Sequence, residues 1–245
     1  REELPLEQAL AQLIGKFGPY YQDVNMAWMW ARLHVRSPHL GYFEGGFQAF
    51  IDRLTETVTG LGGEIRLNCP AEAIRPADGG GVELAAGGVE EMYDAGLVTT
   101  SPSPLARWAP DMAWGYLGRL LELKSMGAVV MTLALSRSLM ADSRTYWLNI
   151  PASSPDKAGG VPFLALVEHT NYIDRSHYGG DHIIYCGDYV LADHPYFSMS
   201  REEIEQLFVG VLHRFNPAFR PEWVRKSWLF RARYAQPVPL LNHSR

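Results

Sequence analysis

"GYFEGGFQAFIDRLTETVTGLGGEIRLN", residues 41–68, contains a helical apolar pattern bounded by two glycine pairs. The pairs are Gly45-Gly46 and Gly62-Gly63, and glycine readily takes the positive φ found at helix ends. Between them, apolar side chains recur at helical spacing: Phe47, Phe50, Ile51, Leu54 and Val58. Apolar and polar residues then alternate over 64–68, which predicts a short half-buried strand. The stretch therefore predicts a glycine-bounded helix followed by a strand.

The composition is that of an ordinary globular protein, with 245 residues, 47% hydrophobic residues and a net charge of −5. The acidic balance argues against a nucleic-acid partner. The longest apolar run, 126–136, is too short to span a bilayer, so no transmembrane segment is expected. Two cysteines, Cys69 and Cys186, favour free thiols in a reducing compartment, and we expect a cytoplasmic protein.

Two features of organisation precede the main sheet. Residues 5–16 and 22–34 predict helices separated at Gly18-Pro19, because proline is not tolerated inside a helix. Residues 79–100 predict a hairpin that turns at Gly87-Gly88, followed by an irregular connection rich in proline. The first residue is Arg1 rather than methionine, which fits a segment of a longer polypeptide.

From residue 126 onward the chain predicts a sheet. Short segments rich in β-branched and aromatic residues follow one another without long helices between them, at 127–135, 145–150, 162–170 and 182–191. Ser200 and Glu203 form a capping box before a helix that we expect to reach residue 215, and a last strand is predicted over 224–235. The predicted fold class is α+β, with a mainly antiparallel sheet and flanking helices.

Catalytic motifs of the common kinds are absent from the sequence, including the phosphate loop, the G-x-S-x-G elbow and paired metal-binding cysteines. We assign no catalytic residue and no metal ligand. The Asp, Glu and His residues of 168–194 could form a metal site, but we favour turn formation. Arg225, Arg231 and Arg233 could bind phosphate, but on a strand opposite aromatic residues we favour a solvated face. Trp28 and Trp30 could line a pocket, but core is the favoured interpretation.

The order of features over 41–104 resembles the middle of flavin-dependent amine oxidase type proteins. That superfamily includes protoporphyrinogen oxidases, phytoene desaturases and, more distantly, UDP-galactopyranose mutases. The resemblance rests on the two glycine pairs and on "NCPAEAI" (68–74), which is similar to an N-x-x-V-x-x-I element. Residues 94–102 loosely resemble a D-x-V-V-x-T-x-P element. "YWLNI", "PFLALVEHTNYI" and "YAQPVP" look like the substrate-side sheet of protoporphyrinogen-oxidase-like members.

The resemblance implies a division into three parts. Residues 1–41 would be the helical part of a substrate-binding domain, 42–109 the middle segment of an FAD-binding domain, consisting of a helix, a strand and a hairpin, and 110–245 the sheet and helix of the substrate-binding domain. It also implies FAD contacts, in which Ala71 replaces the valine that is more frequent in the family. The implied cofactor-binding residues are Gly45, Gly46, Ala71, Thr100, Ser101 and Pro102.

Two family elements are missing from this sequence, namely the N-terminal glycine-rich phosphate loop and the C-terminal Gly-Asp element. Both hold FAD through helix N-termini and backbone N–H groups, so we do not expect tight FAD binding by this chain. The resemblance implies a fragment of an FAD-dependent oxidoreductase, inactive alone, whose parent transfers hydride from a small-molecule substrate to flavin. The alternatives are an interaction domain, which could form a homodimer through an exposed domain face, and a non-redox flavin enzyme of the UDP-galactopyranose mutase type.

Overall fold

The structure, a computed structural model, describes residues 6–34, 39–140, 145–150 and 160–241. The chain forms two compact units, one made of residues 1–36 and 124–245 and the other of residues 37–123. We call them unit 1 and unit 2 and describe each by itself. Each unit contains one antiparallel sheet together with helices, which confirms the predicted α+β class.

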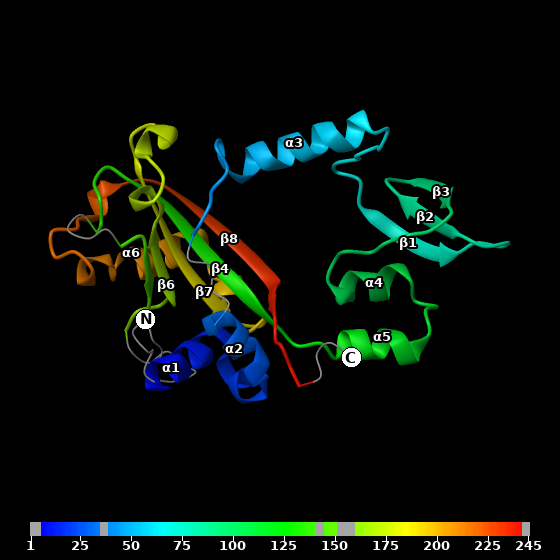
Figure 1. Cartoon of the computed structure of the whole chain (residues 1–245), viewed down its shortest axis with the longest axis horizontal. Helices are drawn as coiled ribbons and strands as arrows, with labels where there is room; N and C mark the ends of the chain where they lie inside the picture. Colours follow the sequence, from blue (N-terminus) through cyan, green and yellow to red (C-terminus); the bar gives the residue numbers. More distant parts are fainter. Residues whose placement is uncertain (1–5, 35–38, 141–144, 151–159, 242–245) are drawn as a thin grey trace. The chain divides into compact units, whose positions relative to one another are not determined.

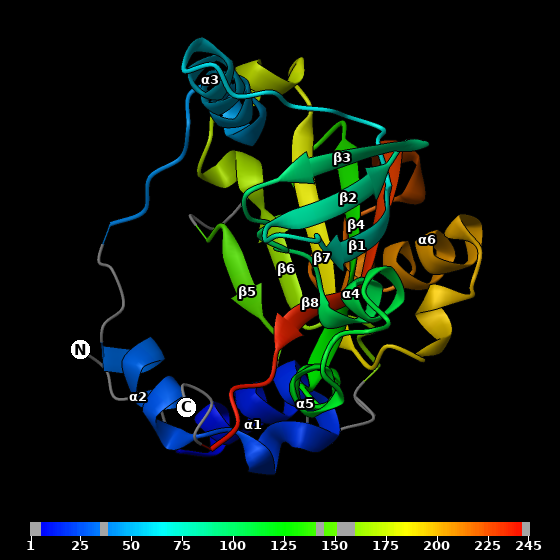
Figure 2. The same ribbon diagram turned by 90° about the vertical axis from the view of Figure 1, so that its right-hand side faces the viewer.

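Unit 1 (Figure 1) is built on a five-stranded antiparallel sheet with the strand order β5-β6-β7-β4-β8, and Figure 2 labels all five strands. β4, the first of these strands in the chain, pairs with β7 on one side and β8 on the other. All five predicted strands are confirmed, with these bounds: β4 Ser125–Leu135, β5 Trp147–Asn149, β6 Ala165–Glu168, β7 His182–Val190 and β8 Val224–Pro237.

One face of this sheet, here called the sealed face, is covered by α6 (Arg201–Val209) and the short η5 (Leu212–Arg214). Its core is fully enclosed and contains Met131, Leu133, Leu135, Leu166, Ile184, Ile204, Phe208 and Leu212. The predicted capping box begins α6: Glu203 N donates to Ser200 Oγ at 3.1 Å, and Ser200 N donates to the Glu203 carboxylate at 2.6 Å. α6 ends at Val209, earlier than predicted, because the next residue is Gly210, which disfavours helix.

Helices α1 (Leu6–Phe17) and α2 (Met26–His34), joined by η1 (Gly18–Asp23), lie at the end of the sheet where β4 begins (Figure 1). The break predicted at Gly18-Pro19 is confirmed, and Gly18 has a φ of 51° that favours glycine. A second core forms here from Phe17, Val24, Met126 and Val238, with Trp28 packed against it. Trp30 is exposed, so α2 contributes only one of its faces to the core.

Unit 2 contains a three-stranded antiparallel sheet in the order β1-β2-β3 (Figure 2). The hairpin turns at Gly87-Gly88, which both have positive φ, and the glycine-bounded helix also forms as predicted. The elements are α3 Gly46–Gly60, β1 Ala71–Pro76, β2 Val82–Ala86, β3 Val89–Tyr93, α4 Pro102–Trp108 and α5 Trp114–Leu121.

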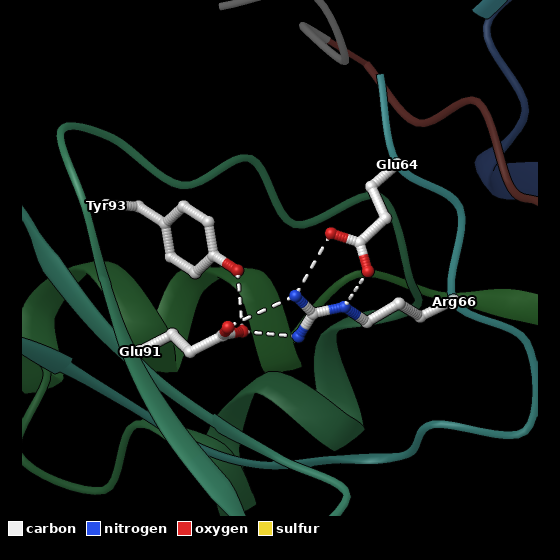
Figure 3. A network of polar contacts seen from close by, with 4 residues as sticks. All are labelled: Glu64, Arg66, Glu91 and Tyr93. Atoms are coloured by element: carbon white, nitrogen blue, oxygen red, sulfur yellow. Dashed lines mark hydrogen bonds and ion pairs between the residues drawn. The ribbon is translucent and has the colours of Figure 1, made fainter. Parts of the chain in front are cut away.

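The strand predicted over 64–68 does not form, and this prediction was wrong. A strand needs a neighbour for its backbone N–H and C=O groups, and none of the described strands pairs with this segment. Arg66 ties the segment to β3 through its side chain, donating to both Glu64 and Glu91, and Tyr93 donates to Glu91 at 2.9 Å (Figure 3).

The connection expected to be irregular contains two helices, so that prediction was also wrong. α4 begins at Pro102. Proline suits the first turn of a helix, since the N–H that it lacks would have no intrahelical partner there. β3 ends at Tyr93, earlier than the predicted second hairpin strand. Within the described residues, no helix is long and apolar enough to cross a bilayer.

Candidate functional site

The side of the unit 1 sheet opposite the sealed face carries aromatic side chains, and we call it the open face. Cross-strand pairing aligns residues in rows, and directly paired residues point to the same side. One row crosses all five strands as Trp147, Val167, Tyr185, Thr132 and Trp228. The adjacent row runs through Asn149, Ala165, Gly187, Val130 and Phe230.

The aromatic side chains of the open face are accessible. Phe230 is 59% exposed, Trp147 49% and Trp228 43%. Ala165 and Gly187, which pair between β6 and β7 on this face, carry no bulky side chain. The open face therefore exposes aromatic contact area, a feature that marks interaction surfaces.

This exposure corrects one expectation for β8. Aromatic and arginine side chains do occupy opposite faces of the strand, as the alternation indicates, but the aromatic face is not the buried one. The arginines are exposed, as predicted, and contact groups around the sealed face. Arg225 pairs with Asp181 at 2.7 Å, Arg231 donates to the Met199 carbonyl, and Arg233 donates to the Ala192 carbonyl.

A histidine–tyrosine pair lies beside the open face. The hydroxyl of Tyr178 is 2.6 Å from Nε2 of His169, and the His169 ring meets the edge of the Tyr185 ring at a centroid distance of 5.6 Å. His169 is 7% exposed, and burial lowers the pKa of its imidazole. The imidazole is therefore neutral near pH 7 and is hydrogen-bonded to a phenol, an arrangement that can move a proton.

Two other polar residues of 168–194, Glu168 and Asp174, have structural roles. Glu168 is fully buried and accepts hydrogen bonds from Ser138 Oγ and Met140 N, both at 2.6 Å, while His182 Nδ1 lies 3.4 Å from its carboxylate. Asp174 caps η3 (Arg175–Tyr178) by accepting from Ser176 N at 2.7 Å. Among the residues that the structure describes, no three potential ligands lie close enough to hold a metal ion.

Lys16 lies at the α1 end of the open face. Its Nζ is 4.7 Å from the centroid of the Tyr189 ring, 5.6 Å from Trp28 and 6.0 Å from Phe17. Burial, and secondly repulsion from Arg32, lower the pKa of the Lys16 amine to about 8. Attraction to a ring face acts the other way, at about 0.5–1 kcal/mol for a partly exposed cation. One pKa unit corresponds to about 1.4 kcal/mol, so a ring contact offsets only part of the shift.

Unit 2 has a pocket of about 940 Å³, close to the upper end of the range usual for small-molecule sites. Ala71 and Thr100, both predicted cofactor contacts, line it together with Leu84, Leu105 and Trp108. Of its basic residues, Arg75 pairs with Glu83 at 2.9 Å and with Glu90 at 3.4 Å. The pocket is therefore mainly apolar and suits an aromatic ring better than a phosphate.

The other predicted cofactor contacts do not line this pocket. Ser101 and Pro102 directly follow Thr100 and begin α4. Gly45 and Gly46 lie at the start of α3, apart from the residues of the pocket wall. α3 has no buried residue, and its apolar stripe is exposed at Phe47, Phe50, Ile51 and Leu54.

Sequence reasoning missed three parts of these sites. Leu105 and Trp108 were overlooked because the prolines of 102–110 indicated a loop. The His169–Tyr178 pair and the Lys16 surroundings join residues whose proximity depends on tertiary packing. The one available signal for Lys16 was its position in a segment rich in aromatic residues.

Comparison with solved structures finds a similar fold in three proteins. A protein provisionally named protoporphyrinogen oxidase from Exiguobacterium sp. 255-15 aligns at 18% identity and a TM-score of 0.65, over 81% of this chain and 41% of that chain. Reduced UDP-galactopyranose mutase aligns at 14% identity and a TM-score of 0.59, over 89% of this chain and 47% of that chain. Cyclohexylamine oxidase from Brevibacterium oxydans IH-35A aligns at 12% identity and a TM-score of 0.58, over 98% of this chain and 55% of that chain.

The chain thus spans about half the length of these solved relatives. No curated protein matches it. The family model for flavin containing amine oxidoreductases matches residues 9–243. The match extends over both units, and the resemblance over 41–104 falls inside it. The chain belongs to the flavin containing amine oxidoreductase family.

Proposed function

We propose that unit 1 is the substrate-binding part of a flavin-dependent oxidoreductase and that its open face binds a small apolar molecule. The observation that carries this proposal is the asymmetry of the sheet. One face is closed by α6 over a fully buried core, while the other presents Trp147, Trp228 and Phe230 with 43–59% of their surface exposed. Exposed aromatic residues in register across a rigid sheet are typical of a binding surface.

The residues of this face have limited but definite chemical roles. The aromatic rows would hold the substrate by apolar contact and exclude water around it. His169 and Tyr178 would accept or return a proton at the Tyr178 hydroxyl, since the buried imidazole is a neutral base. FAD, when bound, supplies the acceptor for the hydride that the substrate loses. This division of labour agrees with a sequence that contains no recognisable nucleophile.

Unit 2 would hold part of the cofactor. Its apolar pocket, with Ala71 and Thr100 in the wall, fits an aromatic ring. Arg75 is paired with two carboxylates, so it would bind a diphosphate only weakly. We propose that Ser101, Pro102, Gly45 and Gly46 complete the contacts by backbone approach. In the functional division, 42–109 then belongs to the cofactor domain, and 1–41 with 110–245 belong to the substrate domain. Tight FAD binding by this chain and turnover by it alone are not expected.

The substrate proposal is tested by equilibrium binding to the purified chain. Cyclohexylamine serves as the probe with an apolar ring and UDP as the diphosphate probe, with tryptophan fluorescence as the readout. The Trp228→Leu variant identifies the signal that comes from the open face. Saturable quenching by cyclohexylamine that Trp228→Leu abolishes supports the proposal. Quenching by UDP alone would support a mutase-type site instead, although Arg225, Arg231 and Arg233 are all engaged elsewhere.

The cofactor proposal needs its own measurement, because substrate and flavin contacts lie in different units. FAD is titrated into the chain, and free FAD is separated by gel filtration. We expect no stoichiometric flavin absorption to remain with the protein. Retention of one FAD per chain would contradict the proposal that the missing phosphate-binding elements are required.

A second function, pairing with another protein surface, is favoured by α3. A helix of 15 residues without a buried residue is only marginally stable in water, and burial of its exposed apolar stripe against a partner would stabilise it. A homodimer through this stripe is the simplest case. Light scattering after gel filtration would then show a dimer for the native chain and a monomer for Phe50→Glu, and a monomer in both samples would rule it out.

A further inference from the structure

Lys16 has surroundings that differ from those of a surface lysine. Its amine lies over the faces of Tyr189, Trp28 and Phe17, and the side chain is only partly accessible. A like charge acts on it, that of Arg32, whose guanidinium lies 5.5 Å from the same Trp28 ring. Among the described residues, no ion pair with a carboxylate involves Lys16.

We propose that Lys16 is a covalent binding site for an apolar aldehyde, which it captures as an imine. The lone pair of the neutral amine attacks the carbonyl carbon, and the carbonyl π electrons move to oxygen. Proton transfer from nitrogen to oxygen gives a carbinolamine, which loses water as the C=N bond forms. One aldehyde and one amine thus give one imine and one water, and no oxidant or reductant is consumed.

The apolar class of aldehyde follows from the rings around the amine. A phenyl or alkyl group carried by the aldehyde would lie against Trp28 and Tyr189 and gain apolar contact there. A small polar aldehyde has no such group and gains no such contact. The imine also removes a charge from beside Arg32, so repulsion between two cations is relieved when it forms unprotonated. Both effects arise from the packing of α1 and α2 against the end of β7.

Lys124 is a matched internal control. Its amine also lies over an aromatic ring, at 4.9 Å from the Tyr20 centroid, but it pairs with Asp23 at 3.0 Å and its side chain is 41% exposed. The two lysines therefore share an aromatic contact and differ in burial and in the sign of the neighbouring charge. At pH 7.4 an amine with a pKa of about 8, as for Lys16, is roughly one-fifth neutral and can attack a carbonyl carbon.

The proposal is independent of the flavin, because capture uses only residues of unit 1. It is tested on the full chain at pH 7.4 with benzaldehyde and cyanoborohydride, which reduces the imine to a stable secondary amine. The chain has four lysines, at 16, 124, 157 and 226, so peptide mass spectrometry assigns each label. We expect the Lys16 peptide to be labelled at least about tenfold faster than the Lys124 peptide, because the Lys124 amine is engaged by Asp23 at 3.0 Å while the rings around Lys16 hold the apolar aldehyde beside its amine.

Two further arms make the result decisive. Glycolaldehyde, a neutral polar aldehyde, should show a smaller preference for Lys16 than benzaldehyde, and an equal preference would overturn the apolar class. In concentrated urea the preference should disappear, because the rings disperse on unfolding. Equal labelling of Lys16 and Lys124 in the folded chain would overturn the site itself. The native chain is used throughout, so a folding defect cannot explain a negative result.

Discussion

The asymmetry of the unit 1 sheet can be tested by truncating one phenylalanine on each side of it. Phe208 of α6 is fully buried on the sealed face, and Phe230 of β8 is 59% exposed on the open face. Phe208→Ala and Phe230→Ala remove the same atoms from the same unit. They therefore differ in burial and not in chemistry.

The expected costs follow from the packing. Phe208 meets the Phe163 ring at 5.3 Å and the Tyr196 ring at 5.6 Å, so its loss leaves a cavity, and such substitutions cost about 3–5 kcal/mol. Phe230 is about two-fifths buried, and full burial of phenylalanine contributes roughly 1.5–3 kcal/mol, so truncation removes about 1 kcal/mol of burial. Lower strand propensity of alanine adds at most about 1 kcal/mol. Phe208→Ala should therefore cost more by about 1–4 kcal/mol.

Urea unfolding of both variants and the native chain, followed by far-UV circular dichroism, measures the difference. Each titration is run at two protein concentrations, because burial in a dimer would make the midpoint depend on concentration. An equal cost for the two variants would refute the inference that the aromatic face is open. A concentration-dependent cost for Phe230→Ala alone would show that a second chain covers it.

Three further outcomes are expected. Ser200→Ala removes the hydroxyl that accepts from Glu203 N and should lower the free energy of unfolding by about 1 kcal/mol in urea titration, and no change would mean that the capping box is dispensable. Burial lowers the pKa of His169, so the unfolded chain is protonated first and stability should fall as pH drops below about 6.5; His169→Gln should weaken this dependence. Folding lowers the pKa of Lys16 from 10.5 to about 8. The free energy of unfolding of the native chain should therefore increase, relative to that of Lys16→Met, as the pH is raised from about 8 to 10.5.

Local patterns in the sequence predicted the elements whose causes are local. The α3 helix follows from its apolar stripe and glycine pairs, the β2–β3 turn from Gly87-Gly88, and the start of α6 from its capping box. The strand predicted over residues 64–68 does not form because its formation depends on a distant partner and not on local sequence. Their alternation is compatible with a strand, but a strand exists only beside a partner, and a single segment does not reveal one.

The candidate sites were predictable only in part. The alternation in β8 separated Trp228 and Phe230 from the arginines, yet it could not decide which face is buried, because that depends on where α6 packs. The resemblance placed Ala71 and Thr100 in a common region, and they do share a pocket wall. Contacts such as Lys16 with Tyr189 join residues far apart in the sequence, and no local signal encodes them.

The distribution of buried residues separates what this chain stabilises by itself from what it leaves uncovered. Unit 1 has a continuous core on its sealed face, and such a core supports cooperative folding. α3, in contrast, buries none of its residues, and a lone helix of this length is marginal, so its stability must come from a surface outside the described part of unit 2. The proposed homodimer would supply that surface from a second copy of the chain. Substitutions in the stripe should thus weaken assembly of the dimer while leaving the unfolding of unit 1 unchanged.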